Sequence, residues 1–295
     1  MSTSPCSEKK KSKIVNCRKP DWLRISRRAD TDYGQVNELL RRYNLNTICR
    51  SGKCPNQAEC WSRGTATFML MGNICTRNCR FCATETGRPL PLDQDEPEHI
   101  ALSVKAMRLR YVVLTCVTRD DLIDQGAQHW ANTIEAIHAQ CPDTMIEVLT
   151  ADLYSDYNLI KQVADAKPHV FGHNLETVRR LTPIARSRAT YDGSLKTLQI
   201  ISGLGLIAKT GIMVGLGETE DEVTKTMQDA KQAGVRVFTI GQYLQPSKKH
   251  LPVEQYITPE QFEKYKKIGL EIGFSFVESG PLVRSSYHAD KIVHC

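Results

Sequence analysis

Apolar positions along this chain gather in short runs, separated by longer stretches with a helical pattern. The runs occupy residues 66–71, 111–117, 145–149, 169–171, 207–214 and 235–240. A short run that is apolar throughout is typical of a strand buried on both faces, and strands that alternate with helices indicate parallel βα units. About six such units can be counted, fewer than the eight of a complete barrel. Periodicity alone does not separate a partial barrel from an open sheet.

Start and stop signals predict where some of the helices lie. Thr219 and Glu222 have the spacing of a capping box, and Gly234 is expected to end the helix that follows. Thr258 precedes a second helix that begins with a proline and ends at Gly273. These helices lie between apolar runs, as the alternation of strands and helices requires.

Composition and charge exclude several classes of protein. Hydrophobic residues make up 41% of the chain and charged residues 24%, the balance of a globular protein. No apolar run approaches the roughly 20 residues of a membrane helix. The net charge of +6 is compatible with an acidic protein partner but does not indicate nucleic acid. Residues 1–18, rich in lysine and serine, are expected to form a disordered basic tail, and a helix is predicted over 32–43.

Cysteine spacing is the most informative chemical signal. Of eleven cysteines, six fall in two groups, the first triplet (Cys49, Cys54 and Cys60) and the second triplet (Cys75, Cys79 and Cys82). Soft thiolates grouped in threes suit an iron–sulfur cluster and leave one coordination position open. Structural zinc, which takes four ligands, and a disulfide framework, which is typical of short secreted chains, are the alternatives. Reduced thiols imply a reducing cytoplasm.

The second triplet also carries a resemblance to a known family. Its loop reads Cys75-Thr76-Arg77-Asn78-Cys79-Arg80-Phe81-Cys82 and resembles the cluster-binding loop of the radical S-adenosylmethionine enzymes. A second motif near the end of the chain reads Arg284-Ser285-Ser286-Tyr287-His288-Ala289. Together with the first triplet, these motifs resemble the lipoyl synthase family over nearly the whole chain.

This resemblance implies an architecture. It implies an α/β fold, a partial (β/α)6 TIM-type barrel with an N-terminal cluster-binding extension and a C-terminal closing segment. The extension is expected at 19–64, the barrel at 65–280 and the closing segment, with its serine ligand, at 281–295.

The resemblance also implies two [4Fe–4S] clusters and bound S-adenosylmethionine. Cys75, Cys79 and Cys82 would hold the cluster that cleaves S-adenosylmethionine. Cys49, Cys54 and Cys60, with Ser286, would hold an auxiliary cluster, although the neighbouring Ser285 leaves that ligand open by one residue. The catalytic set is the second triplet with Ser286. The other residues expected to bind S-adenosylmethionine are Phe81, Thr118, Arg119, Glu147, Asn174, Glu176, Gly215 and Glu218. His173 is expected to be a hydrogen-bonded histidine of the site, not a metal ligand.

The implied activity is a sulfurtransferase reaction of lipoate biosynthesis. Two sulfur atoms would enter at C6 and C8 of an octanoyl chain amide-linked to a carrier lysine, using two S-adenosylmethionine molecules and auxiliary-cluster sulfur. Expected partners are an octanoylated lipoyl carrier domain (2-oxoacid dehydrogenase E2 or glycine-cleavage H protein), an electron donor such as flavodoxin or ferredoxin, and an iron–sulfur carrier that rebuilds the cluster. No nucleic-acid or membrane partner is expected. Another sulfur-inserting radical enzyme, such as biotin synthase, and a non-enzymatic iron–sulfur carrier are the alternatives.

Overall fold

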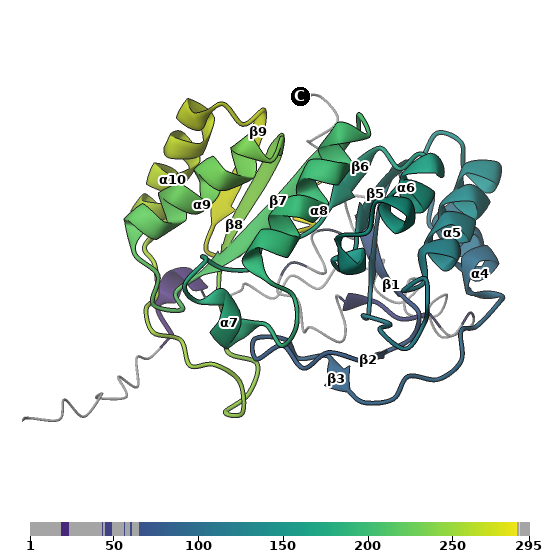
Figure 1. Ribbon diagram of the computed structural model, residues 1–295, viewed down its shortest axis with the longest axis horizontal. Helices are drawn as coiled ribbons and strands as arrows, with labels where there is room; N and C mark the ends of the chain where they lie inside the picture. Colours follow the sequence, from purple (N-terminus) through teal and green to yellow (C-terminus); the bar gives the residue numbers. More distant parts are fainter. Residues whose placement is uncertain are drawn as a thin grey trace, which may run out of the picture.

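A curved parallel sheet of seven strands organises the chain (Figure 1). The computed structural model describes residues 19–23, 43, 45–48, 56, 60, 65–287 and 289. The predicted tail at 1–18, and all of the helix predicted at 32–43 except Tyr43, lie outside the described residues. The seven strands, in their order across the sheet, are β1 (Thr65–Leu70), β4 (Tyr111–Cys116), β5 (Met145–Leu149), β6 (Val170–Gly172), β7 (Ile207–Val214), β8 (Val237–Gln242) and β9 (Phe276–Gly280). β2 (Ile74–Cys75) and β3 (Glu85–Thr86) form a separate two-stranded ribbon.

Helices lie between consecutive strands and cover one face of the sheet (Figure 1). The larger helices are α4 (Glu96–Ala106), α5 (Ala127–Gln140), α6 (Tyr157–Asp165), α8 (Tyr191–Gly203), α9 (Glu220–Gln232) and α10 (Pro259–Ile272). Short helical turns occur at η1 (Asp21–Leu23), η2 (Leu153–Ser155) and α7 (Thr182–Ala185). All sheet neighbours are parallel and follow chain order, so the sheet is the partial barrel that the resemblance implies, with β1 and β9 as its two outermost strands. Residues 46–47 pair with the outer edge of β1.

Both faces of the sheet are buried, as the uninterrupted apolar runs predict. The larger core lies between sheet and helices and includes Leu114, Val148 and Phe238. A smaller cluster on the opposite face includes Val113 and Val237, and it also buries Ala289 from the end of the chain. The C-terminal segment therefore contributes to the packing on the concave side of the sheet.

The predicted helix signals are confirmed. The Thr219 hydroxyl accepts the amide N–H of Glu222, whose carboxylate accepts the N–H of Thr219, and this capping box begins α9. The Thr258 hydroxyl accepts the N–H of Gln261 and caps the start of α10, and Gly273, with φ of 100°, ends this helix. Gly234, with φ of 85°, turns the chain after α9.

Four of the six apolar runs differ in their bounds from the observed strands: β4 ends one residue earlier than its run, β6 is shifted by one residue, and the differences at β8 and β1 have a visible cause. The run at 235–240 is observed as a strand at Val237–Gln242, because the Val235 amide bonds back to Ala230 and completes the end of α9. The run at 66–71 stops as a strand at Leu70, because Met71 adopts φ of 67°. The seventh strand, β9, is not among the predicted runs, since its sequence FVESG mixes polar and apolar residues.

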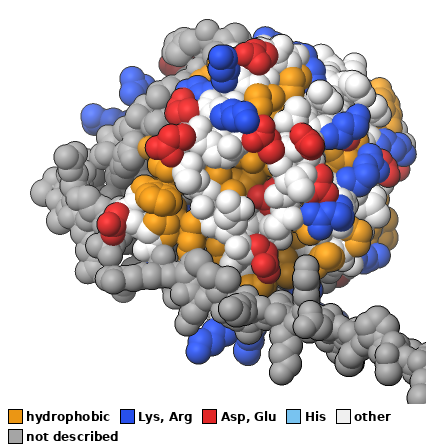
Figure 2. Space-filling view, turned by 90° about the vertical axis from the view of Figure 1, so that its left-hand side faces the viewer, with side chains coloured by type: hydrophobic (Ala, Val, Ile, Leu, Met, Phe, Trp, Pro, Cys, Tyr) orange, Lys and Arg blue, Asp and Glu red, His pale blue; other side chains and the backbone are white. Residues whose placement is uncertain are grey.

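The outer surface is mixed in charge on the side shown in Figure 2, where Lys and Arg are interspersed with Asp and Glu. Helix α9 carries the Lys225–Asp229 pair, and Lys264 of α10 pairs with Glu220. Among the helices that the structure describes, none is both long and apolar enough to cross a membrane.

Candidate active site

The second triplet lies on the loop that leaves β1. Cys75 is in β2, and Cys79 and Cys82 follow in the turn that leads to β3. All three thiols are partly exposed, and the six cysteines that the structure describes are all free. A disulfide framework is therefore absent from the described part of the chain.

Two polar contacts fix the turn at the start of this loop. Met71 donates its N–H to the carboxylate of Glu96 at 2.8 Å, and the same oxygen lies 2.6 Å from the ring of His129. Arg119 donates to the Met71 carbonyl at 3.5 Å and pairs with Asp121 at 2.8 Å. Met71 is held in a left-handed conformation that non-glycine residues rarely adopt. Arg119, expected to bind S-adenosylmethionine, is buried here and supports the loop.

Backbone amides surround the sulfur atoms. Cys75 Sγ accepts N–H groups from Arg77 at 3.4 Å and from Thr118 at 3.3 Å, so Thr118 contacts the loop through its backbone. Thr84 donates its N–H to Cys82 Sγ at 3.5 Å. Burial raises the pKa of the Cys82 thiol, while its hydrogen bonds to Thr84 act in the opposite direction.

This donor set fits an iron–sulfur cluster. Three soft thiols project from one loop, two of them accept backbone N–H groups, and such hydrogen bonds tune cluster potentials. Within the described ranges, no three His, Cys, Asp or Glu side chains converge tightly enough for one metal ion, which is the arrangement structural zinc requires. A cluster contains several iron atoms, so its ligands surround a wider group than one ion.

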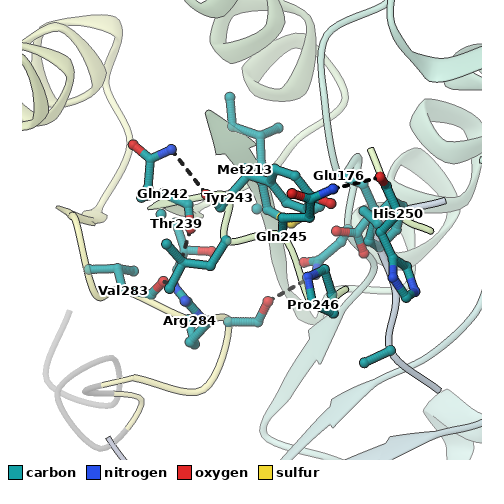
Figure 3. A pocket seen from close by; sticks show the side chains of 18 of the residues that line it. Glu176, Met213, Thr239, Gln242, Tyr243, Gln245, Pro246, His250, Val283 and Arg284 are labelled. Atoms are coloured by element: carbon teal, nitrogen blue, oxygen red, sulfur yellow. Dashed lines mark hydrogen bonds between the residues drawn. The ribbon is translucent and has the colours of Figure 1, made fainter. Parts of the chain in front are cut away.

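A cavity of about 680 Å³ opens beside this loop (Figure 3). Its walls come from the second triplet's loop, the carboxyl ends of β6, β7 and β8, the loop after β8 and the C-terminal segment. The lining residues are Phe81, Ala83, Asn174, Glu176, Gly211, Ile212, Met213, Thr239, Gly241, Gln242, Tyr243, Leu244, Gln245, Pro246, Ser247, His250, Val283, Arg284 and Ser285. Ligands commonly bind at the carboxyl ends of parallel strands, so this is the candidate binding site.

The cavity keeps its shape because two walls approach closely. A Cβ atom at Gly211 would lie 2.2 Å from Thr239 Oγ1, and one at Gly241 would lie 2.2 Å from the Val283 carbonyl oxygen. Only glycine fits at these contacts. The close approach at Gly241 brings the C-terminal segment against β8.

Three of the residues expected to bind S-adenosylmethionine line this cavity: Phe81, Asn174 and Glu176. Asn174 donates its side-chain amide to Ser285 Oγ at 2.9 Å. Glu176 has φ of 69°, and its backbone pairs with β7. Burial raises the pKa of the Glu176 carboxyl, and the nearby Arg186 acts against that shift.

The other expected binding residues do not line the cavity. Glu147 is fully buried and pairs with Lys209 at 2.7 Å. The Glu218 carboxylate instead accepts the backbone N–H groups of Gly215 and Leu216, and it fixes the turn after β7. Gly215 has φ of 99°, which suits glycine at this turn.

His173 is a buried, hydrogen-bonded histidine, as expected. Its Nδ1 lies 3.1 Å from the Thr150 carbonyl oxygen, and its Nε2 lies 2.9 Å from Ser194 Oγ. Burial lowers the pKa of His173 to about 4, with the charge of Arg186 adding to the shift. Both ring nitrogens are engaged, so neither is available as a metal ligand.

The first triplet is only partly described. Cys60 is described, whereas Cys49 and Cys54 lie outside the described residues. Asn56, between Cys54 and Cys60, donates its side-chain amide to the Leu282 carbonyl at 2.7 Å. This contact joins the first-triplet segment to the chain just before the serine pair.

Some cavity residues carry no signal that sequence reasoning used. Gln242 ends β8 and Tyr243 follows it, and polar residues at strand ends could have indicated them. His250 lies eight residues further on, and its Nε2 lies 2.9 Å from the Cys82 carbonyl oxygen. Arg186 does not line the cavity but is buried near Cys79 and Glu176, and within the described structure its Nε has no hydrogen-bond partner.

Known proteins resemble the chain in sequence. The sequence pattern described as the radical SAM superfamily matches residues 69–230. A protein named lipoyl synthase from Parabacteroides distasonis is 56% identical over 274 residues, which cover 93% of this chain and 98% of that protein. Another lipoyl synthase, from Treponema denticola, is 56% identical over 278 residues, with coverage of 94% and 96%.

Solved structures resemble the fold at low sequence identity. Methylornithine synthase has a TM-score of 0.56 and 13% identity, covering 86% of this chain and 87% of that one. The [FeFe]-hydrogenase maturase from Carboxydothermus hydrogenoformans has a TM-score of 0.56 and 13% identity, with coverage of 88% and 81%. These two likenesses concern the fold alone.

Proposed function

Because the chain belongs to the lipoyl synthase family of the radical SAM superfamily, we propose that it inserts two sulfur atoms into a carrier-bound octanoyl chain. The sulfur atoms enter at C6 and C8 and convert octanoyl-lysine to lipoyl-lysine. The observation that carries this conclusion is the three-thiol loop beside the cavity, in a chain 56% identical to a lipoyl synthase over 93% of its length. The enzyme is a sulfurtransferase.

The second triplet fits a resident [4Fe–4S] cluster. Cys75, Cys79 and Cys82 would hold it, and Phe81 places an aromatic ring on the cavity wall beside them. When bound, this cluster supplies the electron that cleaves S-adenosylmethionine and so opens radical chemistry at C–H bonds that no side-chain acid or base can break. The cavity of about 680 Å³ runs from this loop to Met213 and Thr239, and we propose that S-adenosylmethionine and the acyl chain bind in it.

The sulfur comes from a second cluster, which is consumed as a substrate. We assign Cys49, Cys54, Cys60 and Ser286 as its ligands. Ser285 already bonds to Asn174 on the cavity wall, which favours Ser286 as the serine ligand. The contact between Asn56 and Leu282 supports this assignment, because it joins the first-triplet segment to the serine pair.

The remaining chemistry of the site is binding, orientation and exclusion of water. Asn174 and Arg284 place neutral and cationic donors on the wall, and Glu176 places a carboxyl group there. The C-terminal segment at Val283–Ser285 forms one side of the cavity. A closed site protects reactive species from side reactions with solvent.

The partners follow from this reaction. The substrate is an octanoylated carrier domain, of the kind in 2-oxoacid dehydrogenase E2 or glycine-cleavage H proteins. A flavodoxin or ferredoxin supplies electrons, and an iron–sulfur carrier rebuilds the consumed cluster. Such chemistry requires a reducing compartment, so we place the enzyme in the cytoplasm.

One anaerobic turnover experiment tests the proposal. Reconstituted protein is mixed with an octanoyl-lysine peptide, S-adenosylmethionine and dithionite, and methionine and lipoyl peptide are measured. We expect about eight irons per chain and two methionines per lipoyl product. Release of methionine without lipoyl peptide would favour a different sulfur-inserting enzyme, and no methionine release would favour an iron–sulfur carrier.

Single substitutions distinguish the proposed role of the first cluster, cleavage of S-adenosylmethionine, from that of the second, supply of sulfur. Cys75→Ala should abolish methionine release, whereas Cys54→Ala should retain it and lose lipoyl product. Ser286→Ala should weaken retention of the auxiliary cluster, Ser286→Cys should keep that cluster but impair the second insertion, and Ser285→Ala should do less. Equal, near-normal activity in the three serine variants would refute serine ligation.

A further inference from the structure

Arg77 stands in the middle of the second triplet's loop, two residues from both Cys75 and Cys79. Its side chain is 5% exposed, although the loop around it is partly open to solvent. An arginine is rarely buried without anionic partners, because removing its charge from water is costly. The position of this side chain therefore calls for a specific reason.

The Arg77 guanidinium donates hydrogen bonds along two of its edges, one to each of two carboxylates. Nε and Nη2 donate to Asp120 at 2.9 and 2.8 Å, and Nη1 and Nη2 donate to Asp152 at 3.0 and 2.8 Å. Asp120 follows β4, and Asp152 follows β5. Both carboxylates are largely buried, with side-chain exposures of 6% and 13%. The arginine fork thus joins the loop to the carboxyl ends of two neighbouring strands.

The adjacent backbone is docked at the same place. Thr76 receives the Asp120 N–H on its hydroxyl at 3.0 Å and donates its own N–H to the Thr118 carbonyl at 3.1 Å. Cys75 Sγ accepts the N–H groups of Thr118 and Arg77. Residues 118–120 therefore contact Cys75, Thr76 and Arg77 in turn, and the guanidinium extends this docking to β5.

A buried charge network of this kind adds little net stability, because desolvation offsets the attraction between the charges. Its effect is geometric. A planar fork bonded along two edges permits one orientation, whereas a lysine ammonium would permit many. The network consequently specifies where the backbone between Cys75 and Cys79 lies.

We propose that Arg77 is a positioning residue, whose fork to Asp120 and Asp152 holds the three thiols in the one arrangement that retains the cluster. The inference rests on the proposed function, since it takes this loop to be the cluster loop. Arg77 acts through Cys75 and Cys79 and needs no contact with the reacting atoms.

The test uses the full chain with Cys49, Cys54 and Cys60 replaced by alanine, so that iron reports on the second triplet alone. In this parent, and with Arg77→Gln or Arg77→Lys added, we measure iron content, the rate of iron loss to a chelator, and the reduction potential of the cluster. Removing such outer support typically weakens metal binding by about tenfold to a hundredfold, so iron loss should accelerate by that factor. The potential should also change, because the Arg77 N–H that bonds Cys75 Sγ moves with the loop.

Arg188→Gln is the matched control. Arg188 also pairs with Asp120, at 3.2 Å, but its side chain is 59% exposed and it lies outside the loop. This variant should lose iron at the parent's rate. Circular dichroism and melting of each protein show whether it is folded. Should Arg77→Gln not fold, Asp152→Asn gives the same comparison, since it keeps the shape and removes one charge from the network.

The outcomes are distinct. Faster iron loss and a changed potential in folded Arg77→Gln and Arg77→Lys, with parent behaviour in Arg188→Gln, support the inference. Parent rates and potential in folded Arg77→Gln, or full retention by Arg77→Lys, overturn it and leave the proposed function standing. A parent that binds no iron would overturn the proposed function, and this inference with it.

Discussion

The ion pair between Glu147 and Lys209 lies inside the sheet's concave face and yields a quantitative prediction. The side chains are 0% and 3% exposed, so solvent screens neither charge. Both Glu147 oxygens accept from Lys209 Nζ, at 2.7 and 2.8 Å, and one also accepts the Tyr111 hydroxyl at 2.8 Å. Glu147→Gln leaves the Lys209 ammonium buried without its counter-charge. Breaking one partner of such a pair costs about 3–5 kcal/mol.

A double-mutant cycle separates this cost from the net value of the pair. Lys209→Met should be as costly as Glu147→Gln, whereas Glu147→Gln combined with Lys209→Met should lie within roughly 2 kcal/mol of wild type, because both charges leave together. Melting of anaerobically reconstituted protein, with iron content checked, should show single variants lower by roughly 10 °C. Single variants that each cost less than about 1 kcal/mol would refute the reasoning.

The same cycle addresses the expectation that Glu147 binds S-adenosylmethionine. A structural ion pair predicts that the stable double variant still binds S-adenosylmethionine. Loss of that binding in a folded double variant would instead assign Glu147 to the cofactor site.

Three further predictions concern other parts of the fold. The pKa of His173 is about 4 in the folded protein and near 6.5 in the unfolded chain, so below pH 6.5 only the unfolded chain takes up the proton readily. The free energy of unfolding should therefore fall by up to about 3 kcal/mol as pH decreases from 6.5 to 4, and urea titrations of His173→Gln should lack that part of the loss. Thr219→Ala should lower the free energy of unfolding by about 1 kcal/mol through loss of the capping box, and Thr219→Ser should restore most of it. Gly241→Ala places a Cβ 2.2 Å from the Val283 carbonyl oxygen and should expose the C-terminal segment to limited proteolysis, whereas Gly203→Ala, with no atom within 4 Å of its Cβ, should not.

Local patterns in the sequence predicted much of the scaffold. Apolar runs predicted six of the seven sheet strands because parallel strands buried on two faces need apolar residues at successive positions. β9 was missed because Glu278 and Ser279 interrupt its apolar pattern. The start of β8 was misplaced because Val235 belongs by its hydrogen bond to the end of α9, which an apolar run does not reveal.

In the candidate site, too, the sequence predicted the groups that are close together in the chain but not the contacts between distant residues. The cysteines of the second triplet are neighbours in the chain, so their spacing shows that they can surround one centre. The partners of Arg77 lie 43 and 75 residues away, and those of Glu147 lie 36 and 62 residues away. Nothing within a single sequence pairs such distant charges. The Arg77 contacts depend on the order of strands in the sheet, because β4 and β5 are neighbours and the residues that follow them lie next to the second triplet's loop.

The C-terminal segment shows what these long-range contacts accomplish. With Ser286 as the proposed ligand, consumption of the auxiliary cluster would free it, yet three other contacts hold the segment: Asn56 to Leu282, Asn174 to Ser285, and Ala289 within the buried cluster on the concave face. The Asn56 contact comes from the segment between the proposed ligands Cys54 and Cys60, so it is tied to the cluster. The contacts of Ser285 and Ala289 come from the residues just after β6 and from the sheet interior, and they involve no proposed cluster ligand. These two contacts would therefore keep the cavity wall in place when the proposed serine bond opens. A wall that survives loss of the cluster would keep the partly converted chain in the site between the two insertions.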